Sequence, residues 1–199
     1  MELFDICDEN GRPTGRTIER NIAHRDGIAH RTSHVWIVRT ENERAQILLQ
    51  KRQKNKDSFP GMYDTSSAGH IPAGCEPLES ALRELYEELG IRAEGDDLHF
   101  AGSFHADYAL PFHGTIFHDN EYVSVFVCDL PVRIEDIRIQ EDEIEEVQWF
   151  DLEEVYQECS DGIRTRFCVP VEGLNILIRD LEQRKKIRQW GLRKSLKIK

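Results

Sequence analysis

Apolar and polar positions alternate over several short stretches of the chain, as they do in strands with one buried face. Stretches rich in β-branched and aromatic residues predict strands over residues 2–7, 14–19, 34–39, 46–51, 63–71, 98–106, 122–129 and 145–150. The pair Asn10-Gly11 predicts a hairpin turn between the first two of these strands. No internal repeat is visible along the chain.

Three other stretches follow helical spacing. The clearest is residues 77–89, which Pro77 can begin and Gly90 can end. Its leucines fall on one face of the helix: Leu78, Leu82, Leu85 and Leu89. Residues 152–159 and 171–190 are the other two predicted helices. Because strands and helices mix without regular βαβ spacing, the pattern favours an α+β sandwich over a doubly wound sheet.

The length of 199 residues suits a single domain that covers the whole chain. Within it, the pattern predicts N-terminal strands and a loop over residues 1–30 and a core over residues 31–160. A C-terminal helix and a basic tail are predicted over residues 161–199.

The formal net charge of −11 argues against a general nucleic-acid binder, because phosphate binding needs a basic surface. No apolar run approaches the roughly 18 residues of a membrane span. The acidic start of the chain lacks the basic and apolar regions of a secretory signal. The five cysteines are widely spaced and form no CxxC pair, which is typical of thiols in a reducing compartment. These features predict a cytoplasmic protein without a membrane or nucleic-acid partner.

The helix over residues 77–89 carries the candidate chemistry. Glu84, Glu87 and Glu88 lie at spacings i, i+3 and i+4, so their carboxylates crowd onto one face. One interpretation is a solvated acidic face, which is the usual meaning of such a cluster. The other is a site for a hard divalent cation such as Mg²⁺, which prefers carboxylate oxygens. The preceding turn favours the second interpretation, because Gly69 and Gly74 allow a ligand to approach closely.

These residues form part of a longer motif. Gly69 is followed after five residues by Cys75, and after seven more by the segment Arg83-Glu84-Leu85-Tyr86-Glu87-Glu88-Leu89-Gly90-Ile91. The segment resembles the Nudix box, written G-x5-E-x7-R-E-U-x-E-E-x-G-U, in which U is aliphatic. Every fixed position agrees except Cys75, which stands where the first glutamate of the motif belongs.

The resemblance implies an α/β/α sandwich with a mixed β-sheet. It also implies an enzyme that cleaves a small-molecule diphosphate linked to a further moiety, using Mg²⁺ or Mn²⁺. Glu84, Glu87 and Glu88 would be metal ligands together with the Gly69 carbonyl, and Arg83 would orient the glutamates. Because the missing glutamate usually braces the corner between loop and helix, its replacement by Cys75 is expected to lower activity rather than abolish it.

Residues 2–127 are similar to the isopentenyl-diphosphate isomerase branch of the same superfamily. Three histidines and two acids that hold a second metal in that branch match His24, His30, His70, Asp119 and Glu121. Its diphosphate-binding bases match Arg20, Arg52 and Lys56. The resemblance therefore implies a second metal-capable site beside the first.

Hydrolysis is favoured over isomerisation. The isomerase needs a cysteine next to the Gly-His pair, and Ala68, which cannot exchange a proton, occupies that place. The helix glutamates that hydrolysis needs are all retained, and Glu121 and Glu87 are both candidates to take a proton from water. An isomerase-like enzyme and a non-catalytic diphosphate-binding sensor remain the alternatives. The moiety attached to the diphosphate is open, as is the oligomeric state, for which the family makes a homodimer one option.

Overall fold

A computed structural model describes the backbone over residues 2–162 and 166–195, and side chains as far as residue 185. The strands are β1 (Leu3–Cys7), β2 (Pro13–Glu19), β3 (His30–Glu41), β4 (Arg44–Arg52), β5 (Tyr63–Asp64), β6 (Ser67–His70), β7 (Leu98–Phe112), β8 (Thr115–Cys128) and β9 (Ile144–Asp151). The helices are α1 (Arg20–Asp26), α2 (Pro77–Leu89), α3 (Leu152–Ser160) and α4 (Val171–Ser195), with short 3₁₀ turns at Gly95–Asp97 and Ile134–Asp136.

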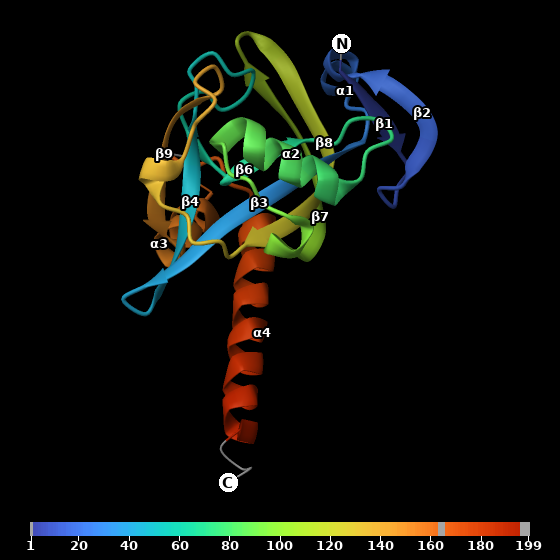
Figure 1. Ribbon diagram of the computed structural model, residues 1–199. Helices are drawn as coiled ribbons and strands as arrows, with labels where there is room; N and C mark the ends of the chain where they lie inside the picture. The colour runs from blue at the N-terminus through green and yellow to red at the C-terminus, as the bar shows by residue number, and fades with distance from the viewer. Residues whose placement is uncertain (1, 163–165, 196–199) are drawn as a thin grey trace.

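Seven of the described strands form one mixed sheet. Its central order is β5-β4-β3-β8-β7, and β6 and β9 pair with β3 and β4 respectively. Strands β3 and β8 run parallel, with His30 opposite Glu121 and Val35 opposite Phe126, whereas the other pairs are antiparallel. Strands β1 and β2 form a separate hairpin, which lies beside the main sheet in Figure 1.

Helices cover both faces of the sheet. Side chains alternate along β3, so Val35 and Ile37 pack with the leucines of α2 on one face. Trp36 and Val38 point to the opposite face, where residues of α3 and α4 pack on them. The predicted α/β/α sandwich with a mixed sheet is therefore confirmed.

The acidic helix has the predicted bounds. Helix α2 begins at Pro77 and ends at Leu89, and Gly90 follows in the left-handed conformation with φ 69°. Glycine tolerates that conformation without steric cost, so it ends the helix.

The N-terminal region contains a helix that the pattern did not predict. Residues 1–30 were expected to hold only strands and a loop, but Arg20–Asp26 form α1, which Gly27 ends at φ 66°. Only Ala23 and His24 of this helix are buried. Seven residues with so few apolar positions give no detectable helical period.

Two strands of the site are longer than predicted. Strand β3 begins at His30 rather than at residue 34, because its polar first residues pair with β6 and β8. Strands β7 and β8 extend beyond the predicted ranges 98–106 and 122–129 to a tight turn at His113 and Gly114. In both places the strand residues are largely polar, so the pattern of apolar positions does not predict a strand there.

The last helix extends farther than predicted, to Ser195. It projects from the body of the molecule as one long helix (Figure 1). Residues 196–199 of the predicted basic tail lie outside the described residues. Of the helices that the structure describes, none is both long and apolar enough to cross a membrane.

The packing of α2 on the sheet predicts a large stability difference between two adjacent residues. Leu85 is fully buried, whereas the next side chain, Tyr86, is 47% exposed. We expect Leu85→Ala to lower the free energy of unfolding by about 2–5 kcal/mol, because it leaves a cavity against the sheet. Tyr86→Ala is the matched control, with an expected loss below about 1 kcal/mol from its exposed contact with Arg92. Urea denaturation measures both; equal losses would contradict the packing described here.

Candidate active site

A cavity of about 480 Å³ lies where β3 and β8 begin. Its walls include His34, Ala68, Val123 and Phe104, which lie on the sheet face that also carries Trp36. The same face of the sheet thus has two regions: one forms the hydrophobic core with α3 and α4, and the other forms a wall of the cavity.

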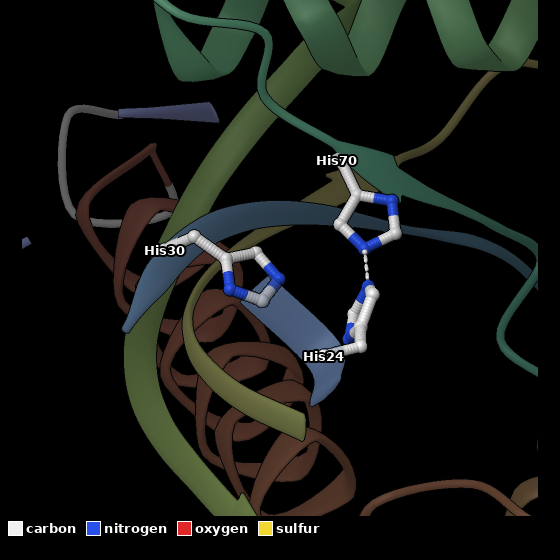
Figure 2. A group of neighbouring side chains, drawn as sticks. All are labelled: His24, His30 and His70. Carbon is white, nitrogen blue, oxygen red and sulfur yellow. Dashed lines mark hydrogen bonds between the residues drawn. The ribbon is translucent and has the colours of Figure 1, made fainter. Parts of the chain in front are cut away.

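Three histidines from three elements meet at this cavity. His24 comes from α1, His30 begins β3 and His70 ends β6. Their ligand nitrogens all lie within 4.8 Å of one another, and no other group of three His, Cys, Asp or Glu side chains in the described residues meets that criterion. Figure 2 shows a ring nitrogen of His24 pointing at a ring nitrogen of His70. These two Nε2 atoms are 3.1 Å apart.

Two carboxylates complete the histidine cluster. Asp119 Oδ1 lies 3.1 Å from His24 Nδ1. Glu121 Oε1 lies 3.4 Å from Nε2 of both His30 and His70. The structure therefore brings together all five residues that the resemblance assigned to a second metal.

The histidine ring orientations suit a metal ion. His30 Nδ1 lies 2.8 Å from the Ile28 carbonyl and can only donate to it, so the lone pair is on Nε2. That Nε2 is buried and has no hydrogen-bond partner among the described residues. Phe4 of β1 stacks on His30 and His70, with ring centroids 4.8 and 4.5 Å apart, and fixes both rings. Imidazole and carboxylate ligands together suit a first-row divalent ion such as Mn²⁺.

The cluster also shifts the pKa values of its members. Burial raises the pKa of Glu121, but the neighbouring imidazoles of His30 and His70 outweigh burial and bring this pKa well below its ordinary value. Burial lowers the pKa of His30, but the Glu121 carboxylate outweighs burial and leaves this pKa raised. Glu121 is thus held as a carboxylate facing the cavity.

The Nudix-like helix presents Glu84 to the same cavity. Glu84 is mostly buried and lies so close to Gly69 that a Cβ atom at Gly69 would be 2.1 Å from Glu84 Cδ. Burial raises the pKa of Glu84, and Arg83, whose Nη2 lies 2.7 Å from Glu84 Oε1, opposes this. Only glycine at position 69 leaves room for this carboxylate.

The other two helix glutamates point elsewhere. Glu88 is only 4% exposed and accepts hydrogen bonds from the Ala68 N–H at 3.1 Å and from Gln50 Nε2 at 3.2 Å. Burial raises the pKa of Glu88 to about 7. Glu87 is half-exposed and pairs with Arg83 Nη1 at 2.8 Å. In this conformation Arg83 links Glu84 to Glu87, and the three carboxylates do not converge on one point.

The three predicted diphosphate-binding bases all line the cavity: Arg20, Arg52 and Lys56. Each is paired with a carboxylate: Arg20 with Asp57 at 3.3 Å, Arg52 with Asp64 at 3.0 Å, and Lys56 with Glu143 at 2.7 Å. Arg52 is also held by Ser58, through its carbonyl and its hydroxyl.

The sequence analysis missed several residues of this cavity, among them His34 and Glu143. His34 is buried on the cavity wall, and Glu143 reaches the cavity from the segment before β9. The spacing of His30 and His34 contained a signal, since residues four apart share one face of a strand. No local signal marks Glu143, because its position depends on the chain returning beside β4.

Comparison with known proteins gives the same family assignment as the motif. The NUDIX domain profile matches residues 30–166 of the chain. The chain is 38% identical over 77% of its length to Nudix hydrolase 3 of Arabidopsis thaliana, but this match spans only 20% of the plant protein. It is 32% identical to an isopentenyl-diphosphate Delta-isomerase of Pectobacterium atrosepticum, over 76% of this chain and 78% of that protein.

A solved structure supports the fold. The crystal structure of DR0079 from Deinococcus radiodurans superposes with a TM-score of 0.63 over 88% of this chain and 97% of that chain. The sequence identity is 18%, so the likeness concerns the fold alone.

The burial of Glu88 predicts a pH-dependent stability in metal-free protein. Because its folded pKa of about 7 lies above the unfolded value of 4.5, Glu88 stabilises the fold below pH 4.5, and this contribution is lost as the pH rises through 7. We therefore expect Glu88→Gln to gain stability relative to wild type, on the order of 3 kcal/mol, between pH 4.5 and 8. Urea denaturation in EDTA measures the difference. Glu87→Gln controls for removing one negative charge from the helix; a gain of equal size there would rule out burial as the cause.

The contact between Gly69 and Glu84 gives a second prediction. A methyl group at Gly69 must displace the Glu84 carboxylate, so we expect Gly69→Ala to weaken Mn²⁺ binding by about 10-fold or more, as removal of a ligand's support does. Electron paramagnetic resonance of free Mn²⁺ measures the affinity. Gly95→Ala is the control, because a methyl group there makes only an ordinary contact, 3.6 Å from Leu78 Cδ2. Unchanged affinity in Gly69→Ala would exclude Glu84 as a ligand.

Proposed function

The chain belongs to the NUDIX domain family, and on that basis we propose that it is a divalent-metal-dependent hydrolase of a small organic diphosphate, nucleoside-linked or related. The family match and the hydrolase relative support a pyrophosphohydrolase. The observation that carries the proposal is the meeting of Glu84, the histidine cluster and three bases at one cavity. Such a site can bind both a cation and the phosphates that the cation neutralises.

We assign two groups of residues to the metal. Glu84, Glu87, Glu88 and the Gly69 carbonyl would hold Mg²⁺ or Mn²⁺, with Glu87 and Glu88 turning from their present partners. His24, His30, His70, Asp119 and Glu121 would hold a second ion. A bound divalent ion supplies charge neutralisation at the transferred phosphoryl group and lowers the pKa of water beside it.

The proton of the attacking water needs a carboxylate that reaches the cavity. Of the two candidates, Glu121 lines the cavity, whereas Glu87 lies outside it and pairs with Arg83. We therefore assign Glu121 as the proton acceptor, held in place by Thr32, whose hydroxyl donates to its second oxygen at 3.3 Å.

The three bases have two different roles: two of them bind the substrate, and the third mainly stabilises the protein. Arg20 and Lys56 form partly exposed ion pairs, which are weak enough to exchange a carboxylate for a phosphate. Arg52 is more buried, with three hydrogen bonds to Ser58 and Asp64. We propose that Arg20 and Lys56 bind the diphosphate directly, and that Arg52 adds positive charge while it anchors the segment after β4.

Isomerisation of a prenyl diphosphate is the second candidate, because the five-residue histidine cluster and the Pectobacterium relative both favour it. Ala68 argues against it, since its methyl group lies on the cavity wall where an exchangeable proton is needed. A non-catalytic sensor is the third, and it would bind diphosphates without cleaving them.

The proposal predicts that hydrolysis depends on the cavity-facing glutamate. We expect Glu84→Gln to lower kcat by about 100-fold or more, as loss of transition-state charge stabilisation does. Phosphate or monophosphate release from a panel of nucleoside and prenyl diphosphates, with Mg²⁺ and with Mn²⁺, measures the rate. Glu79→Gln is the control, because Glu79 is exposed on the first turn of the same helix. Equal rates in wild type and Glu84→Gln would refute the assignment, and tight binding without turnover would indicate the sensor.

A further inference from the structure

His34 occupies the boundary between the core and the cavity. On β3 it follows His30 and Thr32 on the same face and precedes Trp36, which is fully buried in the core. Its register partners are Ala68 on β6 and Val125 on β8. The side chain is only 8% exposed, yet it lines the cavity.

The imidazole of His34 is not fully hydrogen-bonded. Its buried Nδ1 has no hydrogen-bond partner among the described residues. A buried donor or acceptor without a partner costs the folded protein free energy, so such atoms are uncommon and need an explanation. Burial also lowers the pKa of His34, which keeps the ring neutral with one donor and one acceptor nitrogen.

The residues placed directly beside His34 by strand register and ring contact are uncharged, although Asp64, Asp119, Glu121 and Arg52 also act on it by their charge. Phe104 meets the ring edge to face, with 6.1 Å between the ring centroids. Val123 and Pro170 line the same cavity, and Ala68 beside the ring is small. Glu84, Glu121, Arg20 and Lys56 line the same cavity. The cavity therefore offers, in addition to charged groups that suit phosphate, one neutral imidazole with uncharged residues directly beside it.

We propose that His34 is a specificity-determining residue, which pairs with an uncharged hydrogen-bonding group on the moiety attached to the diphosphate. A purely hydrocarbon moiety, such as a prenyl chain, would leave the imidazole nitrogen unpaired in the complex. A moiety with carbonyl, amide or hydroxyl groups, such as a nucleobase or a sugar, pairs with it. The inference rests on the proposed function for the position of the diphosphate.

Binding without turnover tests the role of His34. The probes are methylenebisphosphonate, whose bridge resists hydrolysis, and its esters with the four nucleosides, glucose and dimethylallyl alcohol. Calorimetry in Mg²⁺ compares wild type with His34→Leu, which removes the polar atoms, and with His34→Gln, which keeps a donor and an acceptor. His105→Leu is the matched control, because His105 is on β7 and does not line the cavity.

We expect a nucleoside or glucose ester to bind wild type at least about 10-fold more tightly than both the dimethylallyl ester and the bisphosphonate alone. His34→Leu should remove most of that advantage, leave the affinity for bisphosphonate within about 2-fold, and keep the Tm at or above that of wild type, because it removes an unpaired buried atom. His34→Gln should recover part of the affinity.

Three results would overturn the inference: tightest binding of the dimethylallyl ester, unchanged affinity for the best polar ester in His34→Leu, or an equal loss for all probes with a lower Tm. The last result would make His34 a structural residue. Absence of hydrolysis in the wild type would refute the proposed function and leave this binding test intact.

Discussion

The parallel pairing of β3 with β8 determines where the site can be. Because both strands run in the same direction, the polar starts of their paired segments lie side by side, with His30 opposite Glu121, and the apolar ends of these segments lie side by side as well, with Ile37 opposite Cys128. On one sheet face this places histidines and carboxylates at one end and a dry core at the other. An antiparallel pairing would set the polar half of one strand against the apolar half of the other, and neither cavity nor core could form.

The N-terminal hairpin and α1 supply what the central sheet lacks. The family profile begins at residue 30, yet His24, Phe4 and Asp5 come from the segment before it. Asp5 accepts hydrogen bonds from Gly74 N–H at 2.9 Å and from Arg31 at 3.0 Å, and Arg31 donates to the Cys75 carbonyl at 3.0 Å. This network braces the corner between loop and helix where the motif's first glutamate is missing. It gives a physical reason for the expectation that Cys75 does not abolish activity.

The elements and site residues that could be predicted from the sequence are those whose signal lies in neighbouring residues of the chain. Helix α2 was predicted with its observed bounds, because leucine spacing, Pro77 and Gly90 all act within the thirteen-residue helix or directly after it. The start of β3 was not predicted, because its polar residues adopt strand conformation only through pairing with β6 and β8. The motif identified Glu84, Glu87 and Glu88 as chemically important, but spacing alone could not show that Arg83 draws Glu87 outward while burial and Gln50 draw Glu88 inward.

Electrostatics support the proposal that this acidic protein needs a cation to bind a diphosphate. The chain carries a net charge of −11, and the bases in the cavity are already paired with Asp57, Asp64 and Glu143. A diphosphate that enters alone must compete with these carboxylates and with Glu84 and Glu121 for positive charge. A divalent ion held by the acidic and imidazole groups would reverse the local potential, because its charge would be the largest in the site. The same acidic side chains that repel a free diphosphate therefore become favourable once they hold the cation, so that substrate affinity should depend on the cation far more than on any single base.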